Sequence, residues 1–153
     1  MSDKTAIALL KIEDDQTFIS APEGVTTLPF GSKSLSNKYF IHTPPNENEI
    51  EIVINLVEDA LMPIVADIKK KNYQLVTLDK NAKDIAFYAE VEGTSLSVKD
   101  VEGIFSRMAA IITGRPASTD LLPEENSFIA YELILREVMN HLGFHNIVLI
   151  TSQ

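Results

Sequence analysis

Residues 46–72 read NENEIEIVINLVEDALMPIVADIKKKN, and this stretch decides how the rest of the chain must be arranged. Glutamates open it and lysines close it, which suits the positive N-terminus and the negative C-terminus of a helix dipole. Pro63 cannot donate a hydrogen bond to the carbonyl of Asp59, so either a kink near residues 60–62 or two abutting helices are expected. The stretch predicts a long amphipathic helix on which a sheet packs. The apolar residues that recur at helical spacing are Ile50, Val53, Ile54, Val57, Leu61, Ile64, Val65 and Ile68.

The segments around this helix carry strand and helix patterns. Two further helices begin at the Ser97 cap and at Pro123, and they end at Gly114 and Gly143. Without the first hairpin, and with the last two helices merged, the order is βαββαβ, the ferredoxin-like pattern. The sequence therefore predicts one α+β domain over residues 1–153, in which an antiparallel-rich sheet has helices on one face, an N-terminal hairpin and one extra helix. Strand patterns fall at 5–12, 16–21, 38–43, 73–78, 84–91 and 146–151, and a loop is expected over 22–37.

Composition excludes several classes of function. The chain has 13 Lys and Arg against 22 Asp and Glu, and its net charge of −9 disfavours nucleic acid and membrane surfaces as partners. It has no cysteine, which excludes disulfides, thiolate catalysis and cysteine-ligated metals. No apolar run approaches the roughly 20 residues of a membrane span, and the N-terminus lacks the pattern of a signal peptide. A cytoplasmic location is therefore expected.

One carboxylate falls beside an apolar helix face and is the strongest candidate for acid–base chemistry. In the predicted third helix, Glu132 projects about 40° from the direction of Phe128, and Arg136 follows one turn later. An apolar setting raises the pKa of a carboxylate, so Glu132 could act as a general acid or base. Arg136, Tyr88 and His42 would then orient a ligand between the sheet and the helices. The simpler alternative is an ion pair at the edge of the core.

The histidines do not predict a metal centre. His141 and His145 have the spacing of two metal ligands on one helix, but Gly143 between them is expected to end that helix. Glu137 and His141 form an i, i+4 pair that projects away from the apolar face, which is a common surface arrangement. Dinucleotide, nucleophile-elbow and metalloprotease motifs are absent from the sequence. No metal, cofactor or catalytic residue is therefore predicted.

The helices carry more apolar residues than one sheet face needs. Such residues are covered either by other parts of the same chain or by another chain. Within this chain, the N-terminal hairpin and the loop at 22–37 could provide that cover. Since no catalytic motif is present, we expect a non-catalytic protein-binding or assembly module whose partner is a protein, such as a second copy in a homodimer. The alternative is a small-molecule enzyme or sensor. The surplus residues are Ile52, Leu56 and Ala60, which form a second apolar stripe on the long helix, and Ile129 and Leu133 on the third helix.

Overall fold

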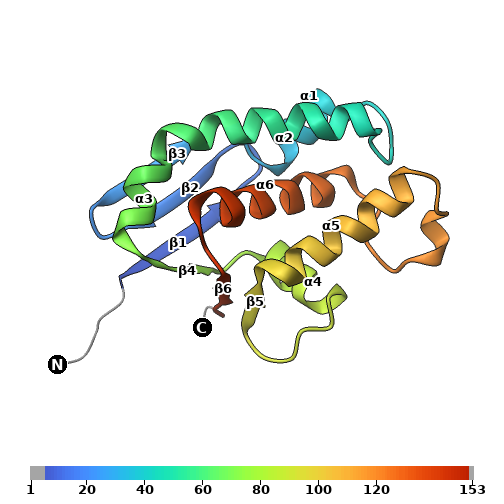
Figure 1. Cartoon of the computed structure of the whole chain (residues 1–153). Helices are drawn as coiled ribbons and strands as arrows, with labels where there is room; N and C mark the ends of the chain where they lie inside the picture. Colours follow the sequence, from blue (N-terminus) through green and yellow to red (C-terminus); the bar gives the residue numbers. More distant parts are fainter. Residues whose placement is uncertain (1–5, 152–153) are drawn as a thin grey trace.

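A computed structural model describes residues 6–151, which form a mixed six-stranded sheet with helices packed on it (Figure 1). The strand order is β3-β2-β1-β4-β6-β5. β1, β4 and β6 are parallel neighbours in the middle of the sheet, and β2, β3 and β5 pair antiparallel on either side of them. The strands are β1 (Ile7–Ile12), β2 (Thr17–Ala21), β3 (Gly24–Leu28), β4 (Gln74–Thr77), β5 (Ser95–Ser97) and β6 (Asn146–Leu149).

Helix α6 is the centre of the helical layer, with α2 on one side of it and α5 on the other (Figure 1). Most of its residues are buried, because α1, α2 and α5 all pack against it. Within residues 6–151, no helix combines the length and the apolar character needed to cross a membrane. The helices are α1 (Ser32–Tyr39), α2 (Glu47–Leu61), α3 (Val65–Lys71), α4 (Lys80–Tyr88), α5 (Val98–Ile112) and α6 (Asn126–Leu142), with 3₁₀ turns at Met62–Ile64 and Ala117–Thr119.

The long helix forms as predicted, and its proline interrupts it as expected. Asn46 caps α2 by accepting a hydrogen bond from the backbone amide of Glu49, and the Glu49 side chain accepts one from the amide of Asn46. Pro63 lies in the 3₁₀ turn that separates α2 from α3. Asn72 ends α3 in the left-handed conformation, with φ of 53°. The second predicted helix is also confirmed, because Ser97 and Asp100 form the capping box of α5.

Two predicted strands are wrong, and the predicted topology changes with them. Residues 84–91 belong mostly to α4, because the apolar residues that are buried, Ala82, Ile85 and Ala86, follow helical spacing, whereas Phe87 is 73% exposed. Residues 38–43 include the end of α1, and the expected loop at 22–37 contains β3 and the start of α1. The sheet is mixed and not purely antiparallel: three of the five strand pairings among the described residues are antiparallel, whereas crossover connections join β1 to β4 and β4 to β6 in parallel. The ferredoxin-like arrangement is not confirmed.

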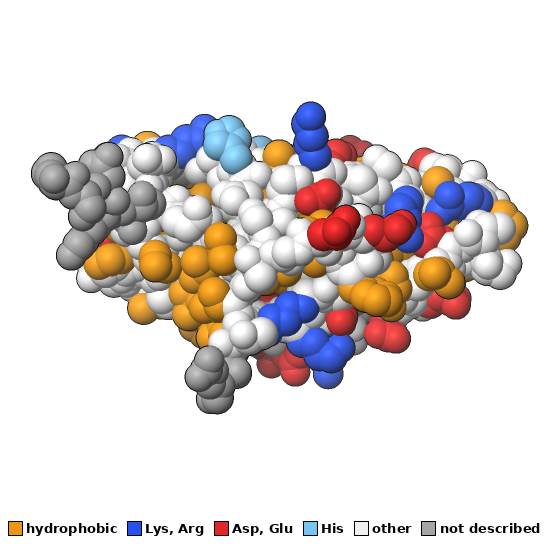
Figure 2. Space-filling view, turned by 90° about the horizontal axis from the view of Figure 1, so that it is seen from below, with side chains coloured by type: hydrophobic (Ala, Val, Ile, Leu, Met, Phe, Trp, Pro, Cys, Tyr) orange, Lys and Arg blue, Asp and Glu red, His pale blue; other side chains and the backbone are white. Residues whose placement is uncertain are grey.

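Side chains of the sheet alternate between a buried and a more exposed face. On β1, Ala8 and Leu10 are fully buried, whereas Ile7 is 55% exposed. The strand register places Leu9, Val76 and Val148 in one row on the same face as Ile7. Seen from below, the molecule shows apolar side chains gathered toward the left of this face (Figure 2). The helices therefore cover the face that carries Ala8 and Leu10.

The start of α1 is tied to the turn between β1 and β2. The backbone amide of Ser32 donates to the carbonyl of Glu13 at 3.0 Å, and the amides of Lys33 and Ser34 donate to the carbonyl of Asp14 at 2.9 Å. The first backbone amides of a helix have no hydrogen-bond acceptor within the helix. Here the carbonyls of the β1–β2 turn accept these hydrogen bonds. The β1–β2 turn is therefore held in place by a helix N-terminus.

Candidate functional site

The carboxyl ends of the three parallel strands lie at one edge of the sheet, which we call the carboxyl edge. β1 ends there at Ile12, β4 at Thr77 and β6 at Leu149. After β1 the chain turns to β2 on one side, and it later returns to β4 on the other side. Ligands of open α/β sheets bind in the crevice at such a point, outside the strand ends. The topology therefore singles out the space between the ends of β1 and β4.

Asp79 lies in this position, two residues after the end of β4. Its carboxylate oxygen Oδ2 accepts hydrogen bonds from the backbone amide of Ile12 at 2.9 Å and from the hydroxyl of Tyr131 at 2.8 Å. Asp79 is also the residue that precedes the first turn of α4, yet its side chain makes no capping hydrogen bond to that helix. The side chain is turned toward β1 and α6 instead, so the fold holds it at the carboxyl edge.

The surroundings of Asp79 change its acidity. Burial raises the pKa of Asp79 above its ordinary value of 3.8, against the opposing effect of hydrogen bonds from Ile12, Tyr131 and Thr77. Burial, and then the charge of Asp79, raises the pKa of Tyr131 well above 10.0. Tyr131 therefore remains a hydrogen-bond donor, and Asp79 is a stronger base than an exposed aspartate. A carboxylate in this state can accept a proton from a bound water molecule.

The turn that follows β1 adds negative charge to the carboxyl edge. Glu13, Asp14 and Asp15 are all exposed there, and with Gln16 they line a shallow polar hollow. The β1–β2 turn contains no glycine. The backbone amides at the start of α1 already donate hydrogen bonds to the backbone carbonyls of this turn. It is therefore unlike the glycine-rich loops that cradle phosphate with free backbone amides. Its exposed carboxylates instead favour cations.

Glu132 and Arg136 lie near each other but not in an open pocket. Glu132 is completely buried, and neither carboxylate oxygen has a hydrogen-bond partner within the described chain. Burial raises its pKa well above 4.5, with Glu102 adding to the shift and Arg136 opposing it. Arg136 pairs with Glu102 at 2.9 Å and lies over the ring of Phe105. A carboxyl group enclosed on all sides cannot touch a substrate in this conformation.

The structure does not bring Tyr88 and His42 to Glu132. The ring of Tyr88 packs edge-on against the ring of Phe128. The backbone carbonyl of Tyr88 accepts a hydrogen bond from Arg107 at 2.7 Å. His42 lies before α2, where its Nδ1 is 3.0 Å from a carboxylate oxygen of Glu49. The four residues that the sequence predicted to bind a ligand therefore occupy three separate places.

The surplus apolar residues are covered to different extents by the chain itself. Ile129 and Leu133 are buried in α6, where they line an apolar groove of about 280 Å³ between α2 and α5. Leu56 and Ala60 are partly buried against the core, and Ile52 is 42% exposed. Most of the surplus is therefore needed to enclose α6 within one chain.

Sequence reasoning missed Asp79, although one signal for it was present. Asp79 follows directly after a strand and precedes a helix, which is the position of site residues in α/β sheets. The pattern was misread because residues 84–91 were assigned to a strand. The hydrogen bond between Tyr131 and Asp79 joins residues 52 positions apart, so spacing along the chain could not indicate it.

Comparisons with known proteins identify the fold. No family model matches the chain, and no curated protein matches it. Among solved structures, the chain is similar to a Ppx/GppA enzyme of Aquifex aeolicus, with a TM-score of 0.76 and 16% identity over 97% of this chain and 54% of that chain. An exopolyphosphatase of Cytophaga hutchinsonii matches with a TM-score of 0.70, again with 16% identity over 97% of this chain and 54% of that one. An exopolyphosphatase-like protein matches with a TM-score of 0.76 and 11% identity, over 97% and 57% of the two chains.

These matches correct the main functional expectation. The sequence favoured a non-catalytic protein-binding or assembly module that forms a homo-oligomer, but the solved structures that share this fold are described as enzymes. That expectation rested on the absence of a known catalytic motif from the sequence. The chain spans about half the length of the solved structures that it matches.

Proposed function

We propose that this chain is a domain of an enzyme that hydrolyses phosphoanhydride or phosphate-ester bonds, with its reactive centre at the carboxyl edge. The similarity to the Ppx/GppA enzyme and to exopolyphosphatases over nearly the whole chain supports this class of reaction. The observation that carries the proposal is the placement of Asp79. It is a half-buried carboxylate of raised pKa, held between the ends of β1 and β4 where the topology favours a ligand.

In the proposed reaction Asp79 acts as the general base. The hydrogen bonds from the Ile12 amide and the Tyr131 hydroxyl both go to Oδ2, and in the proposed reaction Oδ1 faces a water molecule. Asp79 takes a proton from this water as the water oxygen attacks phosphorus, and the bond between phosphorus and the leaving oxygen breaks. Tyr131 and the amide of Ile12 position the carboxylate and do not themselves take the proton.

The charge of the carboxyl edge limits the form of the substrate. Glu13, Asp14, Asp15 and Asp79 would repel a bare polyanion. A magnesium complex of the phosphorylated compound avoids this repulsion, because carboxylates are ligands that magnesium prefers. We therefore propose that the substrate arrives as its magnesium complex.

The proposal predicts that Asp79→Asn lowers kcat by about 100-fold or more, because general-base catalysis contributes about 10²–10⁴ in rate. Phosphate release from inorganic polyphosphate, pyrophosphate and p-nitrophenyl phosphate would be measured with magnesium present. Asp84→Asn is the matched control, since Asp84 lies on α4, the helix that Asp79 precedes, and forms a surface ion pair with Lys80. Circular dichroism would establish that both variants are folded. A wild-type protein that releases no phosphate from these substrates contradicts the proposed function.

Tyr131→Phe is predicted to raise the pKa of Asp79. The hydroxyl of Tyr131 stabilises the ionised carboxylate, and removing it makes ionisation less favourable. The pKa would be followed by NMR of the Asp79 carboxyl carbon during a pH titration, which does not depend on activity. Tyr39→Phe, on α1, serves as the control. An unchanged or lowered pKa of Asp79 in Tyr131→Phe would show that the tyrosine does not position this carboxylate.

A further inference from the structure

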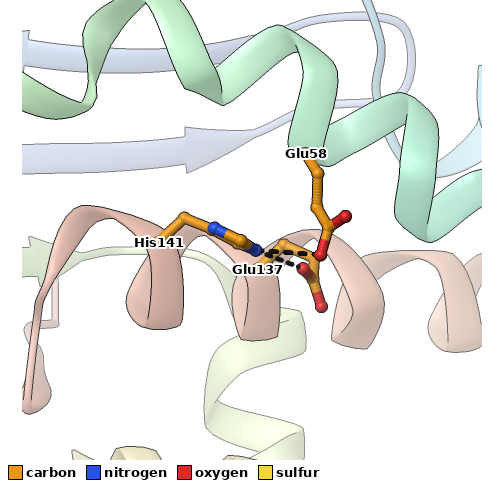
Figure 3. A group of neighbouring side chains, drawn as sticks. All are labelled: Glu58, Glu137 and His141. Carbon is orange, nitrogen blue, oxygen red and sulfur yellow. Dashed lines mark hydrogen bonds and ion pairs between the residues drawn. The ribbon is translucent and has the colours of Figure 1, made fainter.

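Three side chains with metal-binding atoms converge between α2 and α6, away from the carboxyl edge. Glu58 comes from α2, and Glu137 and His141 come from neighbouring turns of α6 (Figure 3). The His141 Nε2 atom lies 3.0 Å from Oε2 of Glu58 and 3.0 Å from Oε1 of Glu137. All three donor atoms lie within 4.8 Å of one another. The sequence could not reveal this group, because Glu58 is 83 residues from His141.

The imidazole of His141 cannot donate a good hydrogen bond to both of the carboxylate oxygens that face it. A neutral imidazole carries one N–H at most on Nε2, and one proton cannot point directly at two carboxylate oxygens. The two carboxylates also lie close to each other. Burial raises the pKa of Glu137, and the hydrogen bond and charge of Glu58 raise this pKa further. The charges of Arg136 and His141 oppose the shift. The arrangement therefore gathers electron-pair donors around a point where a positive charge would be stabilised.

Arg136 fixes the orientation of the buried member of the group. Its Nη1 donates to Oε2 of Glu137 at 2.6 Å, and its Nε donates to Glu102 at 2.9 Å. The other oxygen of Glu137, Oε1, is thereby turned toward His141. Metal-bound carboxylates are commonly held in this way by a partner on their outer oxygen, which orients the ligand and fixes its charge. Glu137 is only 2% exposed, so this orientation is well defined.

We propose that Glu58, Glu137 and His141 bind one divalent transition-metal ion of the Zn²⁺ type. An imidazole nitrogen and two carboxylate oxygens match the ligands of zinc, and a nitrogen ligand favours such ions over Mg²⁺ and Ca²⁺. Two carboxylates neutralise the charge of the ion. The side chains of His141 and Glu58 are 33% and 36% exposed, so water can reach the ion and complete its coordination. The ion would join α2 to α6.

This site is independent of the proposed hydrolytic function. His141 lies ten residues after Tyr131 on α6, which is about 15 Å along the helix at 1.5 Å per residue. A bound ion would therefore strengthen the packing of α2 on α6 and would not meet a substrate at Asp79. The two proposals can fail separately, because metal binding is measured without any substrate.

Zn²⁺ binding is tested by isothermal titration calorimetry and thermal unfolding of the purified, chelator-treated protein. We expect one equivalent of Zn²⁺ to bind and to raise the unfolding midpoint, and Mg²⁺ at the same concentration to do neither. His141→Gln and Glu58→Gln should each weaken binding by at least about tenfold, since even the loss of a residue behind a ligand costs 10–100-fold. His145→Gln is the control, because His145 is exposed just beyond the end of α6.

The Glu58→Gln variant separates the loss of a metal ligand from the loss of the fold. Glu58→Gln removes one of two facing negative charges, so this variant should unfold without metal at or above the wild-type midpoint. A loss of binding in it therefore reports a lost ligand and not a lost fold. Wild-type protein that binds no Zn²⁺ would overturn the proposal. So would Glu58→Gln and His141→Gln that bind as tightly as wild type, or binding that disappears in His145→Gln.

Discussion

Gly31→Ala is expected to destabilise the protein by about 3 kcal/mol, the upper range for overpacking a site that cannot relax. A Cβ atom at this position would lie 2.1 Å from the carbonyl oxygen of Glu13 and 2.5 Å from the carbonyl carbon of Asp14. These are backbone atoms, and the amides of Ser32, Lys33 and Ser34 hold both carbonyls in place. The backbone of Gly31 is extended, with φ of −142°, so steric contact alone requires glycine here.

Urea unfolding of Gly31→Ala against wild type measures this effect, and Gly103→Ala is the matched control. Gly103 lies in α5, where an added Cβ meets no atom within 4 Å. Alanine is favoured over glycine in a helix, so the control should be more stable than wild type by about 0.5–1 kcal/mol. Equal unfolding midpoints for Gly31→Ala and wild type would mean that the β1–β2 turn moves away from α1 at little cost.

Glu132→Gln is expected to become progressively more stable than wild type as the pH rises above 4.5. The folded state keeps Glu132 protonated, because burial raises its pKa well above 4.5, whereas the unfolded state releases the proton near pH 4.5. The folded state then binds more protons than the unfolded state, so wild-type stability falls with pH by about 1.4 kcal/mol per pH unit. Glutamine cannot ionise, and the variant lacks this loss.

The expected difference grows by up to about 1.4 kcal/mol for each pH unit over which the folded state keeps its proton, which is large beside the stability of a domain of this size. It would be read from urea unfolding of both proteins at several pH values, as the difference between the two curves. Glu132→Met should be more stable than wild type at every pH, because it also removes two oxygens that lack hydrogen-bond partners among residues 6–151. Parallel curves for wild type and Glu132→Gln would mean that Glu132 is ionised in the folded protein.

The sequence predicted those elements whose pattern is long enough to distinguish helix from strand. Residues 46–72 and the helix after Ser97 have several turns of apolar spacing and clear caps, and both are confirmed. Residues 84–91 offered only a short alternation, and the buried positions of α4 became clear only in the packed fold. The predicted topology was wrong for the same reason. A strand in place of α4 removes a helix from the crossover between the parallel strands β4 and β6.

The site depended even more on tertiary structure. The spacing of α6 placed Glu132 beside its apolar face, but the degree of burial depends on α5 and on the other helices around it. Asp79 becomes notable only when Ile12 and Tyr131 are known to lie beside it. Glu58 joins Glu137 and His141 across two helices, and an isolated i, i+4 pair gives no sign of a third ligand.

The central place of α6 also has a consequence for how the chain acquires its structure during synthesis. α6 begins at Asn126, yet it is the element around which α1, α2 and α5 pack. β6 follows it, and β4 and β5 both pair with β6. A nascent chain that ends before residue 126 therefore exposes the apolar sides of α2 and α5 and leaves β5 without its neighbour. Folding must wait until α6 and β6, residues 126–149, have left the ribosome, and until then the chain depends on protection from aggregation.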